Sequence, residues 1–464
     1  MRASRLRGAA AAAFLVLALL LGGASARGAG AIGNALLQIV AVLLILFVLW
    51  TRDTEPYPAR ARALIWIVAL FAVLGLLTLV PLPASLWTAL PGRGATAHGF
   101  ELLRIPAPAL PLSLAPGQTI VSLLWLLPPA AMFLLALHCS YRRRRQLLWL
   151  LLIASAVSIG LGAAQLVGGV DSPLRFYQIT NRSSPVGFFS NANHLATLLL
   201  CALPAAGYFA GRARANSRER AKRLSGMMMS VSLAAFLLVG IAVVGSLAGY
   251  GLALPAGFAS LLIYRRAAYG AVGGRWLAGL GILFAVFLGL ALLGPVSSQS
   301  LSEERSASPS SRATLAATTA KAVAANFPAG TGLGTFAEIY WTFQQPDPMV
   351  REYANHAHND YLEIALEMGL PGALLVLCFI LWWARASFAA WTSDAEGGGL
   401  GRAGSVMIGV VLLHSIVDYP LRTSAIASVF ALACALLLPY SGARKQARAS
   451  ADESGGSARH IEVT

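Results

Sequence analysis

The chain has 464 residues, of which 57% are apolar and only 12% are charged, and its formal net charge is +16. A composition this apolar excludes a water-soluble enzyme. The basic residues stand between apolar runs instead of clustering beside aromatic residues in hydrophilic segments, which excludes a nucleic-acid partner.

A helix needs about 20 apolar residues to cross about 30 Å of hydrocarbon. Twelve such runs can be placed, so the sequence predicts one polytopic, all-α membrane domain over residues 1–464, in contact with membrane lipids. In chain order the predicted spans are 9–26, 31–50, 63–82, 118–138, 147–168, 187–210, 227–244, 246–264, 276–294, 370–385, 403–419 and 423–440.

The first predicted span follows a basic start and ends in Ala24-Ser25-Ala26, a sequence that also fits the cleavage site of a signal peptide. Both interpretations fit the sequence. Cleavage would leave 11 spans and would not change the orientation of the others, because the next segment is already outside.

The distribution of basic residues predicts the orientation. With the N-terminus inside, 25 of the 35 Lys and Arg residues fall in cytoplasmic segments, as the positive-inside rule requires. Both termini are then cytoplasmic, and residues 441–464 form a flexible cytoplasmic tail. Loops 83–117 and 169–186 then lie on the outer side. A large loop over 295–369, before the tenth span, lies there too, and it is long enough to be functional.

The large loop begins with a Ser-rich linker and continues as an Ala-rich segment. Ser311 can cap this segment and Phe327-Pro328 stops it, which predicts a helix over 312–326. Arg312 lies in its first turn, where a positive charge opposes the helix dipole and does not stabilise the helix locally. The residue is therefore either functional or an interfacial arginine that meets lipid phosphate.

The loop ends in His356-Ala-His358-Asn359-Asp360, just before a predicted helix that enters the membrane. Asn359 or Asp360 can cap that helix, so His358 lies just before its N-terminus. A histidine at a membrane surface is often just a satisfied polar residue. Imidazole nevertheless titrates near neutrality, which makes His358 the natural general base of the loop.

Two other patterns in this loop suggest a metal site and a nucleotide-binding site. His356, His358 and Asp360 alternate and could present three metal ligands on extended chain, but helix onset near residue 359 breaks the alternation. We therefore expect no metal and no cofactor. Gly330-Thr-Gly332-Leu-Gly334 lacks the spacing and the preceding strand of a nucleotide-binding loop, so it predicts a turn.

Taken together, these motifs resemble the O-antigen ligase and O-antigen polymerase family, bacterial inner-membrane enzymes of the C-type glycosyltransferase class. The resemblance covers roughly residues 30–440. It rests on the stretches Gly187-Phe-Phe-Ser-Asn191-Ala-Asn193-His194-Leu-Ala, Ser311-Arg312 with its helix, His358-Asn-Asp-Tyr-Leu-Glu-Ile-Ala-Leu-Glu-Met-Gly-Leu-Pro-Gly, and His414-Ser-Ile-Val-Asp418-Tyr-Pro-Leu-Arg422.

The resemblance implies transfer of a glycan from an undecaprenyl-diphosphate carrier to a hydroxyl, without metal, on the periplasmic face of the inner membrane. The acceptor is a glycolipid such as lipid A core, the end of another glycan, or a protein. Ligase and polymerase differ only in this acceptor. A transporter is the rival class, but the ionisable residues gather at the outer ends of the spans and not at the bilayer midplane, which favours surface chemistry.

The same resemblance assigns individual residues. The family's essential histidine falls on His358, and the loop-helix arginine that engages the donor diphosphate falls on Arg312. A second family arginine belongs in the turn between the seventh and eighth spans, where this chain has Leu247. Arg182 and Arg351 are the candidates to replace it.

Four residues are predicted to support the site. Asn359 does so as the cap beside His358, and Asn193 as a polar contact between helices. Asp418 and Arg422 are four residues apart, so on a helix they would share one face and pair with each other. The other interpretation of Asp418 and Arg422 is a substrate contact beside His358.

Overall fold

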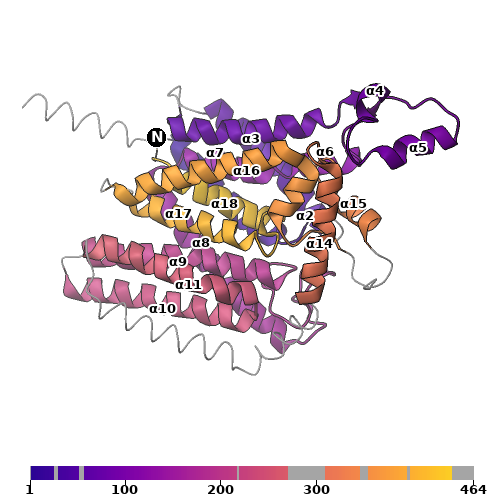
Figure 1. Cartoon of the computed structure of the whole chain (residues 1–464). Coiled ribbons are helices and arrows are strands. Elements are labelled where there is room, and N and C mark those ends of the chain that lie inside the picture. The colour runs from indigo at the N-terminus through magenta and orange to yellow at the C-terminus, as the bar shows by residue number, and fades with distance from the viewer. Residues whose placement is uncertain are drawn as a thin grey trace, which may run out of the picture.

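The computed structural model describes residues 2–25, 30–51, 57–216, 219–269, 309–344, 354–393 and 398–440. Almost all regular structure in these residues is helical (Figure 1). The apolar helices are α1 (Arg2–Leu21), α2 (Ala31–Thr51), α3 (Ala59–Leu77), α6 (Pro116–Leu124), α7 (Leu127–Leu137), α8 (Tyr141–Val167), α9 (Ala192–Asn216), α10 (Arg220–Val244), α11 (Leu247–Ala268), α16 (Asp360–Thr392), α17 (Gly398–His414) and α18 (Ser424–Leu437).

The helices confirm an all-α polytopic membrane fold. Eight helical segments among the described residues are long and apolar enough to cross a membrane, and α17 and α18 are shorter apolar helices. The predicted span 276–294 lies outside the described residues, so the total of twelve stays a prediction. The predicted span 403–419 is wrong at its end, because α17 stops at His414.

Helix α9 is the central element of the bundle. It packs against α10, α11 and α17, and 94% of its most apolar stretch is buried. In Figure 1, α9, α10 and α11 form one layer, and α3, α16, α17 and α18 lie above them. The tight turn from α10 to α11 uses Gly245 at φ 78° and Ser246, whose hydroxyl caps α11 by accepting from the amide of Gly249.

A buried arginine joins the ends of two helices. Arg144 of α8 is 1% exposed, and its guanidinium donates to the carbonyls of Ala136 and Leu137 in the last turn of α7, of Ala435 in the last turn of α18 and of Leu438 just after α18. Carbonyls in the last turn of a helix have no partner within the helix. Arg144 satisfies several of them together and so anchors α18, the helix that follows the candidate site.

One end of the bundle carries the long connections. A two-stranded antiparallel pair, β1 (Pro81–Leu82) and β2 (Leu110–Pro111), together with α4 (Ala84–Trp87) and α5 (Gly94–Leu102), projects from this end (Figure 1). Helices α14 (Pro309–Asn326) and α15 (Phe336–Phe343) lie there too. Helix α14 includes the predicted helix over 312–326 and ends where predicted, but it begins at Pro309, so Ser311 lies within it and not at its start.

A buried side chain and a glycine-rich turn hold these connections together. Arg93, 1% exposed, donates to Asn326 Oδ1 and to the carbonyls of Leu112 and Gly330. Gly330, Gly332 and Gly334 all have positive φ, a conformation that side chains with a Cβ rarely adopt. The segment is therefore the turn that its sequence predicted.

Candidate active site

The candidate site lies at the N-terminus of α16. Asn359 is its N-cap, and its side-chain oxygen accepts from the amides of Tyr361 and Leu362, each at 3.0 Å. Its amide group donates to the carbonyl of Ile416 at 2.9 Å. The predicted cap is confirmed, and it also ties the start of α16 to the turn after α17.

His358 precedes this cap with a φ of 49°, an uncommon backbone conformation for a residue other than glycine. Its Nδ1 is buried and lies 3.2 Å from Oδ1 of Asp418, close enough for an ion pair, although the ring is not aligned for a straight hydrogen bond. The His358 side chain is 30% exposed and that of Asp418 only 1%. The pair therefore consists of an accessible imidazole backed by a buried carboxylate.

The surroundings of Asp418 favour its ionised form. Burial by itself would raise the pKa of this carboxyl, but the contact with His358 and the nearby histidines His194 and His414 hold the pKa well below its usual range. Asp418 is therefore an anion at neutral pH. A buried anion beside Nδ1 favours a proton on that nitrogen, which leaves Nε2 with its lone pair.

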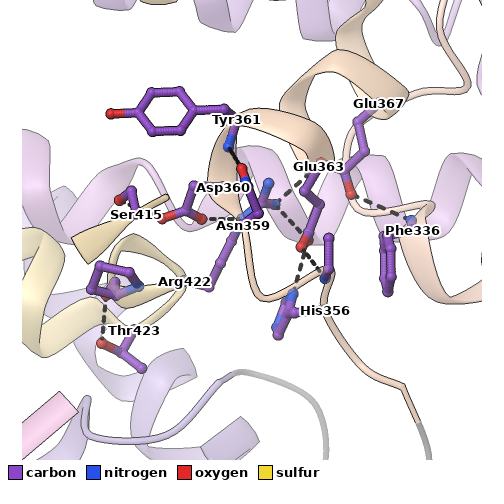
Figure 2. A network of polar contacts seen from close by, with 12 residues as sticks. Phe336, His356, Asn359, Asp360, Tyr361, Glu363, Glu367, Ser415, Arg422 and Thr423 are labelled. Atoms are coloured by element: carbon purple, nitrogen blue, oxygen red, sulfur yellow. Dashed lines mark hydrogen bonds and ion pairs between the residues drawn. The ribbon is translucent and has the colours of Figure 1, made fainter. Parts of the chain in front are cut away.

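Arg422 does not pair with Asp418, contrary to the prediction from the sequence. It lies on the short 3-10 helix η2 (Pro420–Arg422), and its guanidinium contacts Asp360 at 3.4 Å, Glu363 at 3.4 Å and Glu367 at 3.1 Å. Figure 2 shows these side chains converging from α16. A spacing of four places two residues on one face only within one helix, whereas α17 ends at His414 and the chain then turns before η2 begins at Pro420.

Three carboxylates on α16 form a buried acidic face that sequence reasoning missed. Asp360, Glu363 and Glu367 are spaced by three and four residues, so they share one side of the helix, and each is at most 3% exposed. Burial would lower the pKa of Arg422, but these carboxylates raise it above its usual value, so the arginine is charged. Each carboxylate has a further partner: Ser415 donates to Asp360, His356 pairs with Glu363, and the amide of Phe336 donates to Glu367.

The three alternating groups that could have bound a metal do not converge. His356 Nδ1 lies 2.8 Å from Glu363, His358 faces Asp418, and Asp360 contacts Arg422. Within the described part of the chain, no group of three or more His, Cys, Asp or Glu side chains is arranged to hold a metal ion.

The other predicted site residues lie in different places. Arg312 is in the first turn of α14, a helix that packs against α16. Arg182 is exposed in the loop between α8 and α9, where it pairs with Asp171 at 2.8 Å. Arg351 lies outside the described residues. The carbonyl of Asn193 accepts from Thr197, whose hydroxyl contacts His414 Nδ1 at 2.8 Å, so this stretch joins α9 to α17.

The fold and the site thus define a multi-span membrane protein in which His358 pairs with Asp418 beside the N-terminus of α16. Residues 229–377 match the model of a family described as O-antigen ligase. This match agrees with the family that the sequence motifs resemble and supports a membrane glycosyltransferase-like ligase or polymerase. The matched segment includes Arg312 and His358, whereas Asp418 and Arg422 lie beyond it. No curated protein matches the chain.

Proposed function

We propose that the protein moves a glycan from an undecaprenyl-diphosphate carrier to a hydroxyl acceptor on the periplasmic face of the bacterial inner membrane. The observation that carries this proposal is the pairing of His358 with the buried carboxylate of Asp418 at 3.2 Å. A general base needs both access to its substrate and a group that fixes its tautomer. The partly exposed imidazole and the buried anion meet these two requirements.

In the proposed reaction, His358 acts as the general base. The acceptor hydroxyl oxygen attacks the anomeric carbon of the glycan as the bond from that carbon to the diphosphate oxygen breaks. Nε2 of His358 takes the hydroxyl proton, and Asp418 stabilises the imidazolium that forms. The products are the glycosylated acceptor and the carrier diphosphate, to which the proton finally passes.

The leaving diphosphate gains negative charge in the transition state, and fixed guanidinium groups are suited to stabilise it. Arg312 is the proposed donor-binding cation, because α14 packs against the helix that begins beside His358. Arg422 is not proposed for this role, since three buried carboxylates already surround it. Arg182 and Arg351 are the candidates for a second cation at the diphosphate.

Transfer by the purified protein tests this proposal. Wild-type protein in detergent, given an undecaprenyl-diphosphate-linked glycan and a lipid A core acceptor, should release carrier diphosphate and form glycosylated lipid without added metal. A ligase yields this product, whereas a polymerase of the same family yields longer carrier-linked glycan with or without the acceptor. If the donor stays unchanged with every acceptor tried, while proteoliposomes move solute, a transporter is the better interpretation.

The proposed orientation can be tested separately with reporter fusions. An alkaline phosphatase fused after residue 330 should be active, because that position is proposed to be periplasmic, and the same fusion after residue 220 should be inactive. The predicted map places three spans between the two positions, so they must lie on opposite sides. Activity of both fusions, or of neither, would contradict the map.

A further inference from the structure

The ring of Tyr419 lies at the centre of a cluster of histidines. Tyr419 is 7% exposed, and its ring centroid lies 4.8 Å from that of His358 with the planes at 82°, an edge-to-face contact. It lies 4.4 Å from the ring of His356 and 5.3 Å from that of His194. These distances fall in the range where aromatic rings attract one another specifically.

His358 needs a second constraint besides Asp418. Its side chain is partly exposed, and its contact with Asp418 is not aligned as a straight hydrogen bond. One contact of this kind leaves the ring free to rotate about its two side-chain bonds. The edge-to-face contact with Tyr419 is a second contact of the imidazole, and it limits that rotation.

Tyr419 itself makes several contacts that fix its ring, so the ring can hold His358 in place. Its hydroxyl is hydrogen-bonded to the side chains of Asn191 and Asn355. His356, which packs on its ring, is fixed by Glu363 at 2.8 Å, and the other oxygen of Glu363 accepts from the amide of Ala357 at 2.9 Å. These contacts of Tyr419 thus join the start of α9, the turn after α17 and the segment that leads to His358.

We propose that Tyr419 is a positioning residue that holds the imidazole of His358 against Asp418 in the orientation needed for proton transfer. This inference rests on the proposed function, because it assigns Tyr419 a role through the general base His358. It also separates the two parts of the tyrosine, since the ring positions His358 and the hydroxyl only anchors the ring.

The test compares Tyr419→Leu, which removes the ring, with Tyr419→Phe, which keeps it. Misplacing a catalytic group by about 1 Å can cost about 10²-fold in rate, so Tyr419→Leu should lower kcat about 30- to 100-fold with KM little changed. Tyr419→Phe should restore kcat to within about threefold of wild type. The matched control is Tyr208→Leu, a buried tyrosine near the other end of α9, which should leave kcat unchanged.

A second measurement does not depend on glycan transfer. Diethyl pyrocarbonate modifies accessible imidazole nitrogens, and site-resolved mass spectrometry can follow its reaction at His358 relative to the exposed His98. The reaction at His358 should be faster in Tyr419→Leu than in wild type or Tyr419→Phe. If Tyr419→Leu does not fold, Tyr419→Met takes its place in both measurements.

The outcomes distinguish the general-base role of His358 from the positioning role of Tyr419. If His358→Ala still transfers glycan, the general-base assignment fails, and modification of His358 still tests the positioning role. If His358 is essential while Tyr419→Leu keeps wild-type kcat and wild-type modification of His358, the positioning role is wrong and the proposed function stands.

Discussion

Replacing His358 with alanine should lower the rate of glycan transfer by about 10²- to 10⁴-fold, the usual contribution of a placed general base. The protein should still insert and fold, but the buried carboxylate of Asp418 loses its imidazole partner, so some loss of stability should accompany the loss of activity. The measurement is kcat with a fixed donor and acceptor, together with the thermal unfolding midpoint in detergent. We expect a large loss in kcat and a moderate lowering of the unfolding midpoint that is too small to explain that loss.

Two further variants make this prediction specific. His98 is an exposed histidine of another loop, paired with Glu101, so His98→Ala should transfer glycan at the wild-type rate. Asp418→Asn removes the negative charge that favours the required tautomer, so it should lower kcat while His358 is still present. If His358→Ala works nearly as fast as wild type, the base must be sought elsewhere, first around Asp418.

The spans could be predicted because apolar length is a local property of the sequence. Leucine- and alanine-rich runs mark α2, α8 and α10 without knowledge of their neighbours. The cap at Asn359 was predictable for the same reason, since it depends on the amides two and three residues later. Where helix ends depend on packing, as at His414, the predicted boundary was wrong.

The partners of the charged residues could not be predicted, because they depend on the path of the chain after α17. A spacing of four suggested that Asp418 would meet Arg422, but the turn sends Asp418 toward His358 and Arg422 toward α16. One signal was available: Asp360, Glu363 and Glu367 share a helical face. Three carboxylates on one side of a helix that enters a membrane are costly to bury without a cation, and the sequence does not say which cation they meet.

Arg422 is the cation that these carboxylates face in the described structure, and replacing it should be the most destabilising of the changes considered. Arg422→Met would leave Asp360, Glu363 and Glu367 buried without their guanidinium partner. Removing one member of a buried ion pair costs about 3–5 kcal/mol, a large fraction of the stability of most proteins. The variant should accumulate poorly and unfold at a clearly lower temperature, as measured by tryptophan fluorescence in detergent.

The matched control is Arg182→Met, which breaks the exposed pair with Asp171 and should cost less than about 1 kcal/mol. A second-site change separates charge from packing. Glu367→Gln removes one of the buried negative charges, so in the Arg422→Met background it should recover part of the lost stability, whereas alone it should destabilise the protein. Equal unfolding temperatures for Arg422→Met and Arg182→Met would mean that the acidic face is neutralised by protonation and does not depend on Arg422.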